Sequence, residues 1–285
     1  MLVDTKPTTF DELIRISGLS HGTDVWLNNA QELIQQGVVT LNEAICCRDD
    51  IMIYLIKKGL PPNPAFKIME TVRKGKALKD PEKWNGFKEL MKQYDIPDWY
   101  IKSCEKIKYM FPKAHAAAYV TNAFRIAWFK VHIPLAYYAA YYTIRAKAFD
   151  AEFMINGKEK VKNKMKEIEM MGNNAAPKDK EMYDDLEIVL EMYERGITFL
   201  PIDLYKSHAT KFQIEGECLR PPLNSIAGLG NVAAESIMKA RDEEKFMSID
   251  DMKIRAKVGD SVTELLRQFG CLEGMSQSNQ LSLFG

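Results

Sequence analysis

Closely spaced signals for starting helices run through the first 150 residues of this 285-residue chain. Thr9 and Glu12 have the spacing of a capping box, in which a hydroxyl and a carboxylate satisfy the first amides of a helix. Thr40 and Glu43 repeat that spacing ahead of a second expected helix, which ends at Gly59. Such short intervals between signals predict many short helices and leave no room for strands.

Prolines mark the other helix starts in this half. Asn63-Pro64 and Asp80-Pro81 each place a capping side chain before a proline at the first helical position. Three more helices are expected to begin at Pro97, Lys113 and Pro134. This half of the chain is therefore predicted to be all α.

The pattern changes near Gly196. Residues 196–220 alternate apolar and polar side chains and contain Glu215-Gly216-Glu217, which suits a tight turn between short strands. Small helices are expected to follow. We predict a mainly α fold: a multi-helix domain over residues 1–195, a small α+β domain over residues 196–275, and a tail over residues 276–285 expected to be flexible.

Charge is balanced overall but unevenly distributed. Lys and Arg number 39, as do Asp and Glu, so net charge gives no argument for a nucleic-acid partner. Residues 51–147, however, hold 18 basic and 7 acidic side chains, whereas residues 179–195 hold 7 acidic and 2 basic ones. The basic region suits a polyanionic partner, and a solvated Lys-rich helix surface is the alternative.

Neither the cysteines nor the apolar residues indicate an extracellular or membrane protein. The five cysteines form no CxxC pair and have no His spacing suited to zinc, so we interpret them as reduced thiols. The N-terminus carries no basic-then-apolar signal, and no apolar run approaches 18 residues. A cytoplasmic location without a membrane partner is expected.

The strongest local motif is IAGLGNVAA, within residues 222–241. An apolar-Gly-apolar-Gly run before a helix is the helix–hairpin–helix pattern, in which backbone amides approach a phosphate at the positive end of the helix dipole. A glycine-rich turn between packed helices is the alternative. The predicted DNA-binding residues are Gly228, Leu229, Gly230, Asn231 and Val232. Residues 269–274 are a weak candidate for closing a second, degenerate unit.

Two further clusters could contact a nucleotide. In VRKGK, Arg73 and Lys76 flank a glycine and could grip a triphosphate, although basic residues also suit a helix C-terminus. In MFPKAHAAAYV, Lys113 and His115 enter a helix whose alanines leave space for a planar anionic ligand. Tight helix packing would explain the same alanines.

Helical spacing places Tyr119 and Asn122 on the same face as His115, with Arg125 close by. Arg48 is a loose cation in the same half. The chain ends in QLSLF, where Gln280, Leu283 and Phe284 form a compact peptide that could enter an apolar groove on a partner. A tail that docks on its own domain is the alternative.

Taken together, these residues resemble one family. ISGLSHGTDVW, CRDDIM, VRKGK, MFPKAHAAAYVTNAFRIAWFK, NSIAGLGNVAAESIMKAR and the terminal QLSLF occur in the order found in PolC-type DNA polymerase III alpha subunits, the C-family replicative polymerases of low-GC Gram-positive bacteria. The resemblance covers essentially the whole chain but only the last part of that longer protein.

The resemblance implies a function for each part. Residues 1–195 would be the fingers domain, which binds the incoming deoxynucleoside triphosphate and the templating base pair. Residues 196–275 would bind the primer–template duplex, and Gln280–Phe284 would bind the sliding clamp. The residues expected around the triphosphate are Arg48, Arg73, Lys76, Lys113, His115 and Arg125, with Tyr119 near the nascent base pair.

The catalytic part of such an enzyme is not recognisable here. The resemblance places the aspartates that hold two Mg²⁺ ions in a palm domain before this sequence, so no cofactor is expected within the chain. We therefore expect the chain not to polymerise alone, and a separate palm-containing chain is a possible partner. The alternatives are a non-catalytic DNA-binding and clamp-binding accessory module, or a helical scaffold.

Overall fold

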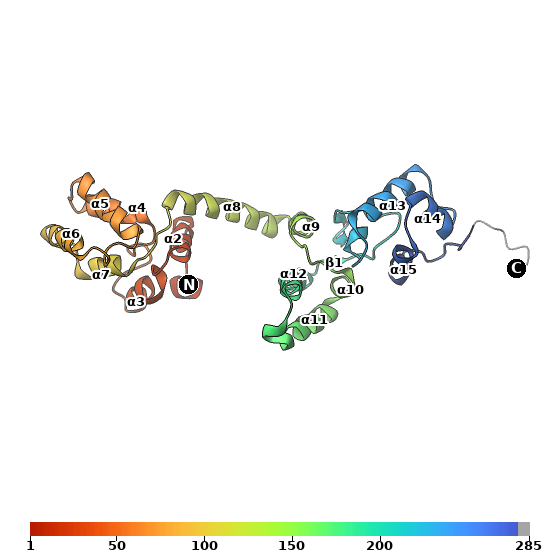
Figure 1. Ribbon diagram of the computed structural model, residues 1–285, viewed down its shortest axis with the longest axis horizontal. Coiled ribbons are helices and arrows are strands. Elements are labelled where there is room, and N and C mark those ends of the chain that lie inside the picture. Colours follow the sequence, from red (N-terminus) through yellow and green to blue (C-terminus); the bar gives the residue numbers. More distant parts are fainter. Residues whose placement is uncertain (279–285) are drawn as a thin grey trace, which may run out of the picture. The chain divides into compact units, whose positions relative to one another are not determined.

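The computed structural model describes residues 1–278 and confirms a mainly α protein with one small sheet (Figure 1). The chain divides into two compact units, Met1–Arg125 and Ile126–Gly285. Helix α8 (Lys113–His132) begins in the first unit and continues into the second. No helix within residues 1–278 is both long and apolar enough to cross a membrane.

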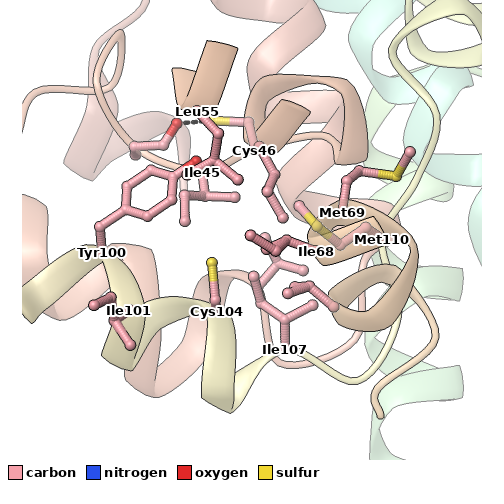
Figure 2. Packing of buried hydrophobic residues seen from close by; sticks show 14 of the residues in the cluster. Ile45, Cys46, Leu55, Ile68, Met69, Tyr100, Ile101, Cys104, Ile107 and Met110 are labelled. Atoms are coloured by element: carbon pink, nitrogen blue, oxygen red, sulfur yellow. Dashed lines mark hydrogen bonds between the residues drawn. The ribbon is translucent and has the colours of Figure 1, made fainter. Parts of the chain in front are cut away.

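The first unit consists of short helices followed by the first part of α8. The short helices are α1 (Leu2–Thr5), α2 (Phe10–His21), the irregular turn η1 (Trp26–Ala30), α3 (Gln31–Gln35), α4 (Arg48–Lys57), α5 (Pro62–Arg73), α6 (Pro81–Gln93) and α7 (Asp98–Lys106). Most of these helices enclose one apolar core, part of which Figure 2 shows, with Leu55 of α4 and Ile68 of α5 facing Cys104 and Ile107.

Several predicted helix starts are confirmed. The Thr9 hydroxyl accepts a hydrogen bond from the Glu12 amide, and the Glu12 carboxylate accepts one from the Thr9 amide, which completes the capping box of α2. Asp80 caps α6. Pro134 is the first residue of α9 (Pro134–Ile144).

Two predicted starts are wrong. Thr40 and Glu43 close a turn, not a helix: the Thr40 amide donates to the Glu43 carboxylate at 2.8 Å. The following residues, 44–47, are buried and belong to no helix, and α4 starts only at Arg48. Helix α5 begins at Pro62, two residues before the predicted Pro64, because Pro61 already has the extended conformation of a residue that precedes a helix.

The second unit combines helices with a three-stranded sheet. Its elements after α8 and α9 are α10 (Ala151–Met154), α11 (Lys158–Met171), η2 (Gly172–Asn174), α12 (Pro177–Glu194), β1 (Thr198–Phe199), β2 (Gln213–Glu215), β3 (Cys218–Arg220), η3 (Leu223–Ser225), α13 (Asn231–Glu243), α14 (Ile249–Ala256) and α15 (Asp260–Gln268). The sheet order is β1-β3-β2, with β3 parallel to β1 and antiparallel to β2.

The predicted tight turn at residues 215–217 is confirmed, because it joins β2 to β3. An aromatic core brings together Tyr142 of α9 with Phe199 and Phe212, whose ring centroids lie 5.6 and 5.3 Å from the tyrosine ring. Side chains from both sides of residue 196 thus share one core. The functional division at residue 195 stays a prediction.

Candidate nucleotide and DNA contact surfaces

The entrance of α8 is capped by a carboxylate from α4. Asp49 Oδ2 accepts a hydrogen bond from the Lys113 amide at 2.8 Å, and the Arg48 amide donates to the Phe111 carbonyl at 3.2 Å. The first turns of α4 and α8 are therefore joined. A phosphate that approached the first amide of α8 would have to displace Asp49.

The alanines around His115 have two different environments. Ala116 is fully buried against Ile14 of α2 and Cys47, where only a small side chain leaves room for two neighbouring segments. Ala114 and Ala118 are exposed instead and leave open space on the other side of the helix. Packing and ligand access, the two explanations of this stretch, thus apply to different alanines.

The predicted face of α8 is exposed. His115, Tyr119 and Asn122 are all accessible, and 64% of the Tyr119 side chain is exposed. Phe124, on the opposite face, packs edge-on against Phe10 with ring centroids 5.5 Å apart. The polar face is therefore turned away from α2.

An aromatic group surrounds the entrance of α8. The Phe111 ring lies 4.9 Å from the ring of His21, 6.1 Å from that of His115 and 6.4 Å from that of Tyr119, measured between centroids. His21, the last residue of α2, thus belongs to this surface. Exposed aromatic and imidazole rings can stack on a base.

The cations near α8 differ in how strongly they are engaged. Lys113 Nζ lies 3.5 Å from Asp11 Oδ1, and Arg48 Nε lies 3.9 Å from Asp49 Oδ2. Arg125 is exposed and pairs with no carboxylate within residues 1–278. Long, partly exposed pairs of this kind are weak and can exchange partners.

The VRKGK cluster is organised by a glutamate on its own helix. Glu70 Oε2 lies 2.9 Å from Arg73 Nη2 and 2.8 Å from Lys74 Nζ. Hydrogen bonds from Arg73 and Lys74 lower the pKa of Glu70 to about 2. Lys76 is exposed and unpaired among the described residues. Arg73 and Lys74 therefore pair with Glu70 and do not bind the last carbonyls of α5.

Gly75 is explained by the fold. Its φ is +62°, and a Cβ there would lie 2.5 Å from the carbonyl oxygen of Lys108. This close approach ties the end of α5 to the segment that leads into α8. Lys113 lies five positions after Lys108, a span of at most about 18 Å. Among the residues that the structure describes, no hydrogen bond or ion pair joins Arg73 or Lys76 to the predicted residues of α8.

The helix–hairpin–helix loop in the second unit presents free amides. Gly228 has a φ of +89°, and Gly230 precedes α13 with no side-chain cap. Within the described chain, the amides of Gly230, Asn231 and Val232 donate no hydrogen bond. A helix N-terminus of this kind favours an anion.

The side chains of this loop divide into a buried and an exposed group. Leu229 is 2% exposed and packs in the core, so only its backbone can meet a ligand. Asn231 is exposed and its Oδ1 accepts from Asn224 Nδ2 at 2.9 Å. Val232 is 83% exposed, so its side chain is accessible.

A second hairpin of the same backbone form lies between α14 and α15, where the sequence pattern gave no signal. Lys257 has a left-handed φ of +53°, Val258 is buried, and Gly259 precedes α15 in extended backbone. Lys257 and Gly259 repeat the backbone conformations of Gly228 and Gly230, and Val258 is buried as Leu229 is. Residues 269–274, the weak sequence candidate for a second unit, form instead the turns after α15.

The two hairpins contact each other reciprocally. Leu265 of α15 lies 3.3 Å from the position that a Cβ at Gly228 would take. In the other direction, Ser236 Oγ of α13 donates to the Ala256 carbonyl at 2.6 Å. Leu265 and Ser236 are each the sixth residue of their helix, so the pair has approximate two-fold symmetry.

The hairpins differ in charge. The first residue of α15 is Asp260, whereas that of α13 is Asn231. Lys253 Nζ lies 2.6 Å from Asp260 Oδ1, and this hydrogen bond lowers the pKa of Asp260. A carboxylate at this position repels phosphate, so the first hairpin is the better anion site of the two.

Gln280, Leu283 and Phe284 lie outside the described residues, so their role stays a prediction. Within residues 1–278, no three His, Cys, Asp or Glu side chains gather closely enough to hold a metal ion.

Comparison with known proteins identifies the relatives of this chain. Residues 1–95 match the model of the bacterial DNA polymerase III alpha subunit finger domain, and residues 196–281 match a helix-hairpin-helix motif. The whole chain aligns with proteins named DNA polymerase III PolC-type: it is 57% identical to that of Caldanaerobacter subterraneus subsp. tengcongensis and 58% identical to that of Bacillus subtilis, each over 284 residues. The chain is related to PolC-type DNA polymerase III over its whole length.

The resemblance found in the sequence is thereby confirmed. The PolC-type protein of Clostridium perfringens is 55% identical over 285 residues. In each case the alignment covers the entire chain but only 19–20% of the relative. The chain thus spans about a fifth of the length of these PolC relatives.

Proposed function

We propose that this chain supplies the nucleotide-binding and duplex-binding parts of a PolC-type replicative DNA polymerase. The observation that carries the proposal is the first hairpin, where the amides of Gly230, Asn231 and Val232 have no partner within residues 1–278. Free amides at a helix N-terminus contact phosphate without reading the base, as duplex binding by a polymerase requires.

A charge exchange between the hairpins tests duplex binding. Asn231→Asp gives the first hairpin the carboxylate that the second one carries, and we expect duplex affinity to fall about tenfold, or about 1.4 kcal/mol. Asp260→Asn, the matched reverse change, should leave affinity unchanged or raise it. Fluorescence anisotropy with a blunt duplex at several salt concentrations measures both, and a scaffold without a DNA role would show no change in either variant.

The proposed nucleotide surface is the exposed face of α8. His115 and Tyr119 offer rings for the base pair, while Lys113 and Arg125 offer charge to the triphosphate. Arg48 lies beside them. Arg73 and Lys76 lie near the other end of the segment that leads into α8. An incoming nucleotide would compete with Asp11 for Lys113 and with Glu70 for Arg73.

A second candidate function is an accessory module that binds DNA and the clamp without binding nucleotide. The observation in its favour is that Lys113 and Arg73 already have carboxylate partners. Lys113→Ala and Arg73→Ala distinguish the two proposals. A polymerase part should lose nucleotide crosslinking in both variants, whereas an accessory module should crosslink no nucleotide even before substitution.

We further propose that the chain does not polymerise alone. The Mg²⁺ ions of the complete polymerase would need free carboxylates, and Asp49 and Asp50 do not fit this need. Asp49 Oδ2 accepts from the Lys113 amide at 2.8 Å, and Asp50 Oδ2 accepts from the Cys47 amide at 2.8 Å. Magnesium-dependent primer extension by the purified chain would contradict this proposal.

A further inference from the structure

A cavity of about 340 Å³ lies in the first unit, between α4, the first turn of α7 and residues 38–45. This volume is within the range of sites that bind small molecules. None of the residues proposed above for the nucleotide or for the duplex lines the cavity. It is therefore a separate feature that the proposed function leaves unexplained.

One wall of the cavity is aromatic. Tyr54 of α4 and Tyr100 of α7 stack with ring centroids 4.3 Å apart and ring planes inclined by 16°. Trp99 packs edge-on against Tyr100 with centroids 5.4 Å apart, and all three residues line the cavity. Two exposed apolar side chains, Val38 and Ile53, line it as well. Such surfaces suit a planar ring.

The hydroxyl of Tyr100 has no hydrogen-bond partner among the described residues, although the residue is only 1% exposed. Figure 2 shows its ring directed toward Ile45, which also lines the cavity. Burial raises the pKa of Tyr100 well above its usual value, so the hydroxyl keeps its proton and is a donor. A buried donor without an acceptor lowers stability, and an acceptor inside the cavity would relieve this cost.

Asp50 supplies an acceptor to the same cavity. Its Oδ2 accepts hydrogen bonds from the amides of Cys46 and Cys47, at 3.1 and 2.8 Å, and lies 3.9 Å from Arg15 Nη1. Within residues 1–278, no hydrogen bond or ion pair involves its Oδ1. One carboxylate oxygen is therefore left to accept a hydrogen bond from a ligand.

We propose that this cavity binds a small planar amide, which is an aromatic or heteroaromatic ring that carries a carbonyl and an N–H side by side. The carbonyl oxygen accepts from the Tyr100 hydroxyl, and the N–H donates to Asp50 Oδ1. The ring packs against the aromatic wall. An aromatic carboxylate fits less well, because it has no N–H to donate and its charge is repelled by Asp50.

Benzamide and benzoate are the probes, because they share a ring and a carbonyl group and differ in the N–H and in charge. Binding to the full chain is followed by NMR, with the indole N–H of Trp99 as the reporter. We expect benzamide to bind with a Kd of about 1–10 mM, as for other small fragments, and benzoate to bind about tenfold more weakly. Tyr100→Phe removes only the hydroxyl and should weaken benzamide binding about fivefold.

Tyr94→Phe is the matched control, because Tyr94 packs against the same core and does not line the cavity. It should bind benzamide as the unmodified chain does. Equal affinity in the unmodified chain and in Tyr100→Phe would overturn the proposal, as would benzoate that binds as tightly as benzamide. A cavity that shows no binding of benzamide at all, and so holds water only, would also overturn it.

The state of the Tyr100 hydroxyl can be tested without a ligand. If it has no partner in the folded chain, Tyr100→Phe loses no hydrogen bond, so the melting temperature should stay the same or rise. A melting temperature lower by more than about 2 °C would show that the hydroxyl already has a partner, and this result would overturn its role as a donor to a ligand.

Discussion

At the scale of single residues, Gly75 decides how closely two segments of the first unit approach. Its φ of +62° and the 2.5 Å distance from a built Cβ to the Lys108 oxygen both exclude a side chain. Gly75→Ala should lower the free energy of unfolding by about 3 kcal/mol, which combines left-handed strain with overpacking. Urea unfolding followed by circular dichroism measures the loss.

Gly86 provides the control for this substitution. It lies inside α6, and a built Cβ there meets no atom within 4 Å. Gly86→Ala should therefore raise the stability by about 0.5–1 kcal/mol, because alanine favours a helix. Two substitutions of equal chemistry are thus expected to act with opposite sign, and equal losses would contradict the role given to Gly75.

Asp185 couples the stability of the second unit to pH. It is 5% exposed, and its Oδ2 accepts a hydrogen bond from the Ala148 amide at 3.1 Å. Burial raises its pKa to about 6 from the usual 3.8. Between about pH 4 and pH 6 the native state thus binds a proton that the unfolded chain releases, so stability falls as the pH rises through this window.

Asp185→Asn removes the charge and keeps an acceptor for the Ala148 amide. We expect the variant to be about 2 kcal/mol more stable than the parent at pH 7 and equally stable near pH 4. Asp184→Asn changes the exposed neighbour and should alter stability by less than about 0.5 kcal/mol. An Asp185→Asn gain that is the same at both pH values would rule out titration as its cause.

At the scale of elements, the start of α8 depends on Asp49. Its carboxylate accepts from the Lys113 amide, so Asp49→Ala leaves the first amide of the helix without this partner. A loss of about 1 kcal/mol in unfolding free energy is expected, as for other helix caps. Faster hydrogen exchange of the Lys113 amide would locate the effect at the helix start.

Asp11→Ala is the control for the cap. Asp11 meets Lys113 only through an exposed side-chain pair at 3.5 Å, which contributes less than about 0.5 kcal/mol. If the two substitutions cost the same, the carboxylate of Asp49 acts through charge and not as a cap.

Helix starts were predictable where local chemistry decides them. Thr9 and Asp80 bind amides three residues away, so a short pattern contains the whole interaction. The start of α4 was not, because Cys47 is a poor capping residue and the bonds come from the side chain of Asp50. At Thr40 the same local pattern closes a turn, since burial of the residues that follow outweighs it.

The candidate surfaces divide in the same way. Gly228 and Gly230 identify the first hairpin because glycine is the usual residue at a left-handed position. The second hairpin places Lys257 there, at a cost of about 1 kcal/mol that its surroundings offset, so no glycine pattern reveals it. The partner of Lys113 also escaped prediction, since Asp11 is more than a hundred residues from Lys113 in the chain.

At the scale of the whole molecule, the predicted mainly α fold is confirmed, while the two compact units do not follow the predicted functional division. The sequence changes its pattern at Gly196, but tertiary packing joins Tyr142 to Phe199 across that point. Hydrophobic periodicity describes one helix or strand at a time, so it does not show that distant elements share a core.

Two compact units predict two unfolding transitions. One apolar core lies wholly within residues 1–125, and two others lie within residues 126–278, while α8 passes from one unit to the other. Calorimetry of the full chain should therefore resolve two transitions at pH 7. Gly75→Ala should lower the temperature of one of them, and Asp185→Asn should raise that of the other, because each residue packs within its own unit. A single transition that both substitutions shift would show instead that the units unfold together, with stability passing between them along α8.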